Sequence, residues 1–554
     1  MKDKPKSFLV RGLEILPGTL TWVTLLGSPI LSYFYPGAVA IYIILFDLYW
    51  LLKGANVAIH LMHSYHTLRV HNGVDWLDWL NRLWTSREDF VNHLKHEYGG
   101  AQKMLTRNLY ESSLERMNKL PLDRNFDWKR IYHLILLPTV SEDFEVLDQS
   151  IGSCANADYP SDKMIFVLSY EERGGEVAVQ NAQRLQEKYH NKFYKFLSVQ
   201  HPDGLEGEAK VKGANITFGA KTALKLIEEL GIPLEDIVVS GFDSDTTVSK
   251  NYFAHLTFNF ITALKPHRTS YQPLPMFHNN IWDTPAIARV IAISSSFWQL
   301  VEASRPDRLI TFSSHAMSFK TLVDVDFWRV DIIPDDSHIF WQCFLHFDGD
   351  YRTEPLFTTV SMDAVLGDTY FETMLAQYKQ KRRWAWGVTE ISMVIPEFLR
   401  NKKIALWKRL LYGERLFEQH YFWATASVMI AILGWMPLIL GGDRFDNSVL
   451  ALNLPVMTKV IMSVATVFLI FSIYVNMVLL PPRPKGYSAW KTLSMVTQWV
   501  FAPIVSSLFG SMPAIDAQTR LMFRRYMEFF VTPKRRRANV SEEIPPDAII
   551  KEAK

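Results

Sequence analysis

The chain has 554 residues, 48% of them hydrophobic and 13% aromatic, so it can form two or three domains with a large core and is not a disordered protein. Its 59 Lys and Arg residues nearly balance its 57 Asp and Glu residues, which excludes the dominant basic field of a nucleic-acid binder. The two cysteines, Cys154 and Cys343, are far apart in the sequence, which argues against a disulfide framework or a cysteine zinc site and suits a reducing compartment.

The first predicted element is a helical hairpin near the N-terminus. Its arms are the apolar residues 19–34 and 37–52, with Tyr35-Pro36 as the turn between them. Within the second arm, Asp47 is expected to face another helix or to snorkel, and a functional relay role stays open. By the positive-inside rule both ends of the hairpin are cytoplasmic, because basic residues flank them: Lys2, Lys4, Lys6, Arg11 and Lys53.

The middle of the chain alternates short apolar runs with helical patterns, which is typical of an α/β sheet. Predicted strands cover residues 131–137, 164–168, 193–199 and 236–241, and predicted helices between them cover residues 178–189 and 218–230. Sheets of this kind bind ligands at the carboxyl ends of their strands. Polar residues directly after these strands are therefore the candidate site residues.

The fourth predicted strand delivers Asp243-Ser244-Asp245. Two carboxylates at alternate positions can hold a hard divalent cation, Mg or Mn, which neutralises a diphosphate as it leaves. The same pattern recurs at residues 324–326 and 348–350, and the alternative for each is a solvated turn. Because the first pattern alone follows a fourth apolar strand, we predict that Asp243 and Asp245 bind the metal.

A second candidate motif is the segment Gln380-Lys381-Arg382-Arg383-Trp384. On a helix, Gln380, Arg383 and Trp384 share one face. That face offers an amide, a guanidinium for phosphate or carboxylate, and an aromatic platform for a sugar. The alternative is a basic amphipathic helix at the membrane surface, and the two interpretations are compatible.

A second apolar hairpin is predicted near the other end of the chain. Its arms are residues 421–440 and 457–480, and a basic turn follows at residues 481–485, so both ends are again expected in the cytoplasm. Residues 491–512 are apolar too, but prolines and a glycine interrupt them and a basic tail follows. We therefore predict an interfacial or re-entrant segment there.

These elements give one predicted organisation from end to end. In order it comprises a transmembrane hairpin (1–60), a cytosolic helical linker (61–126), a catalytic domain (127–400), an interfacial helix (401–420), a transmembrane hairpin (421–482), an interfacial or re-entrant segment with a gating-like loop (483–534) and a polar tail (535–554).

The order of motifs resembles glycosyltransferase family 2, in its membrane-bound branch with the cellulose and hyaluronan synthases. The resemblance rests on a strand, Asp243-x-Asp245, a later acidic pair and Gln380-x-x-Arg383-Trp384 before membrane helices, and it covers about residues 127–534. It implies an α/β fold class with a Rossmann-like, A-type glycosyltransferase domain, here with transmembrane hairpins at both ends. It also implies a nucleotide-sugar donor and inversion at the anomeric carbon.

The resemblance further implies a general base, which is the last residue of the family's Thr-Glu-Asp motif. The matching residue is Asp336, and Asp335 replaces the Glu as a substrate-binding candidate. Inversion needs such a carboxylate to take the proton of the attacking acceptor hydroxyl. A neighbouring carboxylate would raise its basicity. The alternative is an Asp that caps a helix beginning at Ser337.

Other residues are carried over from softer matches. Glu142 stands where the family has a nucleotide-binding loop after the first strand, and Lys212 and Asn215 resemble the Lys-Gly-x-x-Asn segment that reaches phosphate and ribose. After the second strand the family has an Asp that recognises the base, for which Glu171 or Glu172 substitutes here.

Near the end of the chain, residues 529–534 match the Phe-x-Val-Thr-x-Lys gating loop of bacterial cellulose synthase. Thr532 and Lys534 are therefore expected to close over the diphosphate and exclude water. The alternative is a membrane-exit segment, in which the basic run of residues 534–537 anchors the chain to anionic lipid.

The sequence thus predicts a multi-pass cell-membrane enzyme with a cytoplasmic catalytic domain. It would move a sugar from a nucleotide-diphosphate donor to a glycan or lipid-linked acceptor, and processive and single addition both stay open. The alternative from another class is a catalytically silent membrane scaffold or sugar-sensing subunit with the same fold. A transporter would need more spanning helices than the sequence predicts.

Overall fold

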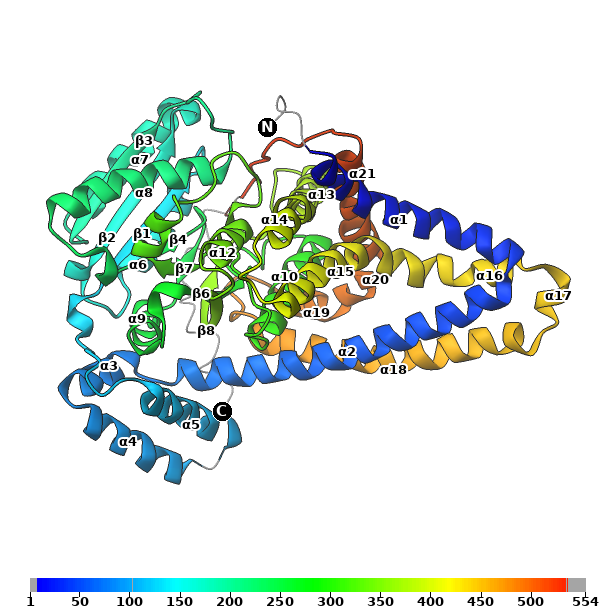
Figure 1. Cartoon of the computed structure of the whole chain (residues 1–554), viewed down its shortest axis with the longest axis horizontal. Coiled ribbons are helices and arrows are strands. Elements are labelled where there is room, and N and C mark those ends of the chain that lie inside the picture. The colour runs from blue at the N-terminus through cyan, green and yellow to red at the C-terminus, as the bar shows by residue number, and fades with distance from the viewer. Residues whose placement is uncertain (1–6, 102, 535, 537–554) are drawn as a thin grey trace.

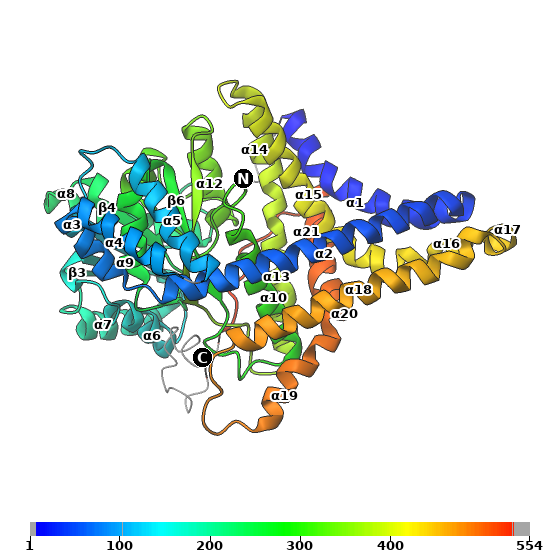
Figure 2. The same ribbon diagram turned by 90° about the horizontal axis from the view of Figure 1, so that it is seen from below.

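The computed structural model describes residues 7–101, 103–534 and 536. A domain built on a β-sheet fills one end of the molecule, and long helices from both ends of the sequence extend away from it (Figure 1). The view from below shows the same separation (Figure 2). The predicted polar tail of residues 535–554, apart from Arg536, and the flanking Lys2, Lys4 and Lys6 lie outside the described residues.

The sheet has eight strands in the described part of the chain, in the order β3-β2-β1-β4-β7-β6-β8-β5. They are β1 (Tyr132–Thr139), β2 (Met164–Glu171), β3 (Lys195–His201), β4 (Ile237–Gly241), β5 (Thr247–Val248), β6 (Thr269–Met276), β7 (Ala316–Ser318) and β8 (Arg352–Ser361). Strands β3, β2, β1 and β4 are mutually parallel, and β8 is parallel to β6. Strand β7 is antiparallel to β4 and β6, and β5 is antiparallel to β8.

The parallel strands are apolar on both faces because helices cover both faces of the sheet. In β1, Ile135 and Leu137 join one hydrophobic core, and Leu134 and Leu136 join the other. Alternation along a strand places these two pairs on opposite faces. The four strands predicted from the sequence are confirmed as β1 to β4.

The helices between residues 144 and 400 surround this sheet (Figure 1). They are α6 (Phe144–Ala155), α7 (Gly175–Tyr189), α8 (Lys212–Glu229), α9 (Tyr252–Thr262), α10 (Ala286–Ala303), α11 (Phe319–Asp324), α12 (Asp335–His346), α13 (Tyr370–Ala385) and α14 (Thr389–Arg400). Helix α8 begins six residues before the predicted boundary at residue 218, so Lys212 and Asn215 lie in its first turn.

Further helices come from both ends of the chain. The N-terminal ones are α1 (Phe8–Phe34), α2 (Pro36–Asn72), α3 (Trp76–Thr85), α4 (Arg87–Gly100) and α5 (Met104–Lys119). The C-terminal ones are α15 (Leu406–Ala431), α16 (Met436–Leu440), α17 (Gly442–Asp446), α18 (Val449–Leu479), α19 (Ala489–Thr497), α20 (Ala502–Val505) and α21 (Met512–Met522).

Helices from opposite ends of the sequence pack against each other. Helix α2 runs beside α18 in both views (Figures 1 and 2), and Thr458 of α18 donates to Asp47 of α2. Asp47 therefore faces another helix, as predicted. Helix α1 packs on α21, where Thr21 donates to the buried amide of Gln518.

Four helices in the described residues are long and apolar enough to cross a membrane: Phe8–Phe34, Pro36–Asn72, Val449–Leu479 and Ala489–Met522. The run predicted as one arm at residues 421–440 is instead a bent pair, Leu406–Ala431 and Leu433–Leu440, with 49° between its parts. Residues 489–522, predicted as interfacial or re-entrant, form a helix of spanning length that is broken by a 3₁₀ turn and a π-helical turn.

Apolar side chains cover the outside of these helices. On α18, Val449, Leu452 and Ile470 are each more than half exposed. A lipid environment is the usual partner of such a surface. The predicted α/β fold class with apolar helical hairpins at both ends is confirmed by this arrangement.

Candidate active site

One ammonium group joins the two acidic motifs of the sequence. Lys212, the first residue of α8, places its Nζ 2.6 Å from Asp243 Oδ1 and 2.9 Å from Asp336 Oδ1. Asp243 follows β4 and Asp336 lies in the first turn of α12, so three separate segments meet at this lysine. Burial alone would lower the pKa of Lys212, but the two carboxylates outweigh it and raise the pKa, so the amine stays charged.

Gly213 lets these segments come close. A Cβ at this position would lie 2.3 Å from the backbone oxygen of Arg329 and 3.1 Å from the Cβ of Asp335. Any side chain here would push α8 away from the loop that leads into α12. The glycine after Lys212 is therefore required by the packing of the two helices that carry the lysine and the acidic pair.

Asp243 is the member of the predicted metal pair with the lowered pKa. Its Oδ2 accepts from Ser313 Oγ at 2.7 Å, and its Oδ1 accepts from Lys212. Burial alone would raise the pKa of Asp243, but Lys212 and Lys534 outweigh that effect and hold the pKa well below its usual range.

Asp245 lies deeper, with a side chain that is 0% exposed. Lys534 Nζ is 2.6 Å from its Oδ1, and the backbone N–H of Asp363 donates to its Oδ2 at 2.7 Å. Burial raises the pKa of Asp245 in spite of Lys534, with Asp363 and Asp243 adding to the rise.

The acidic pair at the start of α12 divides into a buried and a half-exposed carboxyl group. Asp335 is buried, its Oδ2 has no hydrogen-bond partner among the described residues, and burial with the adjacent Asp336 raises its pKa to about 8. Asp336 is more exposed and forms an ion pair with Lys212. The raised pKa thus belongs to the member of the pair that was predicted to bind substrate, Asp335.

The capping interpretation of this pair is wrong. Helix α12 begins at Asp335 itself, Pro334 occupies the cap position, and no side chain caps the helix. Asp336 instead points its oxygens at Lys212, with His315 Nδ1 at 3.9 Å. The Asp336 side chain therefore contacts Lys212 and does not cap its own helix.

Helix α13 carries Gln380, Arg383 and Trp384, and the helix predicted for them is confirmed. Arg383 lies within the electrostatic reach of Asp243, Asp335 and Asp336, while burial lowers its pKa. Its guanidinium stacks on the Phe529 ring at 4.6 Å. Gln380 is buried, and its Oε1 accepts from Gln377 of the same helix.

Glu142 stands at the edge of the acidic site. Its Oε2 accepts from Thr139 Oγ1 at 2.6 Å and from the backbone of Val140, and its Oε1 accepts from Ser244 Oγ at 2.8 Å. It therefore fixes the loop after β1 to the Asp243-Ser244-Asp245 turn. The structure places Glu142 beside this turn, and nucleotide contact stays a prediction.

Asn215 lies behind this edge. It is buried, accepts from Ser169 Oγ at 2.6 Å and donates to the backbone oxygens of Thr139 and Ser169. These bonds connect the carboxyl ends of β1 and β2, so the Asn215 amide stabilises the strand ends next to the site. Glu172 is exposed after β2 and accepts from the backbone of Asp203, whereas Glu171 is buried and paired with Arg173.

The C-terminal segment lies against the same acidic site. Lys534 pairs with Asp245, and Arg536 pairs with the fully buried Asp363 at 2.8 Å. The predicted lipid anchor is wrong for these two residues, because both charges face carboxylates of the sheet domain. Thr532 is buried with an Oγ1 that has no partner among the described residues.

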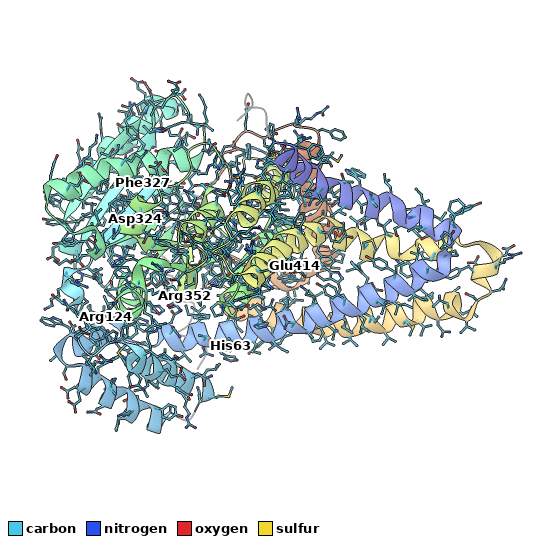
Figure 3. All side chains as sticks on the ribbon, in the orientation of Figure 1. His63, Arg124, Asp324, Phe327, Arg352 and Glu414 are labelled. Atoms are coloured by element: carbon cyan, nitrogen blue, oxygen red, sulfur yellow. The ribbon has the colours of Figure 1, made fainter. Side chains whose placement is uncertain are left out.

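Sequence reasoning missed Asp363, Ser313 and Arg536. Asp363 follows β8 as Asp243 follows β4, so a strand prediction for residues 352–361 would have revealed it. The other Asp-x-Asp patterns are surface features: Asp324 and Asp326 are exposed, and Asp350 pairs with Lys265 and Arg268. Figure 3 places Asp324 among the side chains of the sheet domain.

Asp243 and Asp245 fit a divalent cation by their chemistry. No group of three or more His, Cys, Asp or Glu side chains in the described part of the chain is arranged to hold a metal by itself. The two carboxylates offer hard oxygen donors, and both already attract an ammonium group. Two carboxylates with the oxygens of a diphosphate are a common ligand set for Mg²⁺.

No family model matches the chain, and no curated protein matches its sequence. In structure it is similar to the mannosyltransferase PcManGT from Pyrobaculum calidifontis in complex with GDP-Man and Mn²⁺, at 15% identity and a TM-score of 0.35 over 76% of this chain and 97% of that one. It is also similar to S. aureus TarS 1–349 with UDP-GlcNAc, at 12% identity and a TM-score of 0.33 over 65% of this chain and 95% of that one.

A third similar structure is GalNAc-T7 with UDP, GalNAc and Mn²⁺, at 10% identity and a TM-score of 0.32 over 58% of this chain and 55% of that one.

Proposed function

We propose that this chain is an inverting membrane glycosyltransferase of the family 2 type, with its catalytic domain in the cytoplasm. One observation carries the proposal: Lys212 lies between Asp243 of the predicted nucleotide site and Asp336, the predicted base. A donor and an acceptor that use these two carboxylates would thus meet within the reach of one lysine.

The nucleotide diphosphate would bind at the carboxyl ends of β1 and β4. Asp243 and Asp245 would hold a divalent cation, Mg or Mn, which when bound neutralises the diphosphate charge. Lys212 keeps its charge beside them and can shift from Asp243 to a phosphate oxygen. Arg383, which interacts electrostatically with the same carboxylates, adds a second positive charge.

Asp336 would act on the acceptor. Its carboxylate takes the proton of the acceptor hydroxyl as that oxygen bonds to the anomeric carbon and the bond to the diphosphate breaks from the opposite face. Thr532 and Lys534, at the C-terminal segment, would cover the diphosphate and exclude water. Trp384 offers a ring on which a sugar can stack.

The test is a donor panel. Purified protein in detergent is incubated with nucleotide sugars and Mg²⁺ or Mn²⁺, and released nucleoside diphosphate is measured for wild type, Asp336→Asn and Asp326→Asn. We expect release from one donor to fall about 10²- to 10⁴-fold in Asp336→Asn, the usual contribution of a general base. Asp326→Asn is the matched control because Asp326 is exposed, with its side chain 91% accessible.

Equal release by wild type and Asp336→Asn would reject Asp336 as the base. Measurable donor binding without release from any donor would instead support a silent scaffold. The anomeric configuration of the product tests inversion, and its length separates a processive synthase from a single-addition enzyme.

A further inference from the structure

Glu390 is a buried carboxyl group that the proposed chemistry does not use. It lies in the first turn of α14 and is 2% exposed. Its Oε1 accepts from Ser337 Oγ at 2.6 Å, and its Oε2 accepts from Trp341 Nε1 at 3.2 Å. Both donors belong to α12, the helix that carries Asp336. One carboxyl group therefore uses both of its oxygens to bind the helix of the predicted base.

The two donors fix how α12 is rotated. Ser337 and Trp341 are four positions apart, so they lie on one face of the helix, one turn after the other. Bonds from one side chain to both points restrain the helix against rotation about its axis and against sliding along it. Asp336 directly precedes Ser337, so its side chain points about 100° away around the helix. The direction of the Asp336 carboxylate thus depends on the bonds to Ser337 and Trp341.

The Asp336 carboxylate needs a support of this kind. In the described part of the chain no side chain caps the start of α12, where Pro334 occupies the cap position. Lys212 Nζ lies 2.9 Å from Asp336 Oδ1, but the same ammonium also binds Asp243 and would turn to the diphosphate of a bound donor. The bonds of Glu390 do not involve this lysine. They can therefore hold Asp336 in place while Lys212 moves.

Folding stability alone does not account for a carboxyl group at this position. Helices α12 and α14 pack against each other (Figure 1), and the Trp341 and Phe398 rings meet in one hydrophobic core with their centroids 6.1 Å apart. No basic side chain within the described residues pairs with Glu390, and burial raises its pKa to about 7. An apolar side chain would avoid the cost of burying a carboxyl group here. A buried polar contact can instead select one arrangement of two helices.

The place of Glu390 in the sequence links the base to the predicted acceptor face. Helix α14 follows α13 after a short turn at residues 386–388, and Glu390 comes six residues after Trp384. Arg383 and Trp384 therefore belong to the same helical stretch as the residue that binds α12. The bonds of Glu390 set the position of Asp336 relative to this face.

We propose that Glu390 is a positioning residue, which holds the Asp336 carboxylate at the angle from which it takes the acceptor proton. The inference rests on the proposed transferase function and adds a residue to its machinery. Glutamine should replace Glu390 well, because its Oε1 can accept from Trp341 while its Nε2 donates to the Ser337 hydroxyl, which is both a donor and an acceptor. Methionine has a similar length and can form neither bond.

The first test needs no turnover. A water-soluble carbodiimide joins a lysine to a carboxylate that it contacts, so Lys212 should become linked to Asp336 and to Asp243, and peptide mass spectrometry gives the ratio of the two links. We expect Glu390→Met to lose most of the link to Asp336 and to keep the link to Asp243. Glu390→Gln should keep the wild-type ratio. Glu397→Met is the matched control, because Glu397 is a half-exposed residue of the same helix.

Ser337→Ala removes one of the two bonds at a half-buried position and should lose part of the link between Lys212 and Asp336. It decides the question if Glu390→Met does not fold. A wild-type ratio in folded Glu390→Met, or in Ser337→Ala where Glu390→Met does not fold, overturns the proposal. The cross-link needs no donor, so this failure is separate from a failure of the transferase function, which the donor panel tests.

The second test measures release of nucleoside diphosphate in two backgrounds. In the wild-type background, Glu390→Met should lower kcat about 10- to 100-fold with the donor KM unchanged, as a small misplacement of a reacting group does. In the Asp336→Asn background the same change should cause no further loss, because a positioning residue acts through the residue that it positions. An equal loss in both backgrounds would show that Glu390 supports the fold as a whole, which contradicts the proposal.

Discussion

Lys534 Nζ lies 2.6 Å from Asp245 Oδ1, so a residue near the end of the chain neutralises a carboxylate buried at the end of β4. The pair joins the segment after α21 to the buried end of the sheet domain. It also means that Asp245 keeps a positive partner in the absence of a divalent cation.

Lys534→Ala should release the C-terminal segment. Removing one partner of a buried ion pair leaves an uncompensated charge and costs about 3 kcal/mol. We expect faster tryptic cleavage at Arg536 and lower transferase activity. Lys402→Ala is the control, because Lys402 is an exposed lysine on the loop between α14 and α15. Unchanged cleavage at Arg536 in Lys534→Ala would show that the pair does not hold the segment.

Asp335→Asn should remain active at pH 7, unlike Asp336→Asn. The pKa of Asp335 is raised to about 8, so the carboxyl group is already neutral at pH 7 and an amide reproduces its charge. As the pH rises through 8, ionisation of Asp335 adds a negative charge beside Asp336 and Asp243, and we expect wild-type activity to fall. The variant should lack this decline, as a pH–rate profile of both proteins will test.

If Asp335→Asn were as inactive at pH 7 as Asp336→Asn, the charged form of Asp335 would be needed. The prediction of a neutral carboxyl group there would then be wrong.

Glu390→Gln should flatten the dependence of stability on pH. Glu390 accepts from Ser337 Oγ and Trp341 Nε1, and burial raises its pKa to about 7. Because the folded-state pKa is raised, the native protein holds a proton that the unfolded chain has lost, and stability falls as the pH rises from about 4.5 through 7. The loss is about 3 kcal/mol.

The measurement is the Tm of detergent-solubilised protein between pH 4.5 and 8. Glu397→Gln, which changes a half-exposed residue of the same helix, should keep the wild-type slope. A wild-type slope in Glu390→Gln as well would contradict the assignment.

Gly213→Ala should lower donor turnover by more than its loss of folding stability alone would predict. Its Cβ would lie 2.3 Å from the oxygen of Arg329, so α8 must move and carry Lys212 away from Asp336. Overpacking of this kind costs about 1–3 kcal/mol. Gly99→Ala, where no atom lies within 4 Å of the added Cβ, is the matched control. Equal donor turnover by both variants would contradict the need for a glycine at residue 213.

Much of the fold was predictable because its signals are local. Strands β1 to β4 are continuous apolar runs, and the polar residues that follow them do lie at one edge of the sheet. Strand β8 escaped prediction because Arg352, Glu354 and Pro355 interrupt its apolar pattern. Asp363, which follows that strand, was missed for the same reason.

The partners of the site residues could not be predicted from spacing. Lys212 was expected to reach phosphate, and its contacts with Asp243 and Asp336 depend on the packing of α8 against α12. Asn215 was expected at a ribose, but the first turn of α8 aims its amide into the sheet. Lys534 and Asp245 are nearly 300 residues apart in the sequence, and no local pattern predicts a contact over that separation.

The contact between α1 and α21 has a consequence for the order of synthesis. Thr21 and Trp22 of α1 bond to Gln518 and Thr519, which are made about 500 residues later. The first apolar helix must therefore wait with its polar face unpaired until the ribosome has passed Met522. Until then the whole sheet domain emerges and folds beside an apolar helix that still lacks its partner.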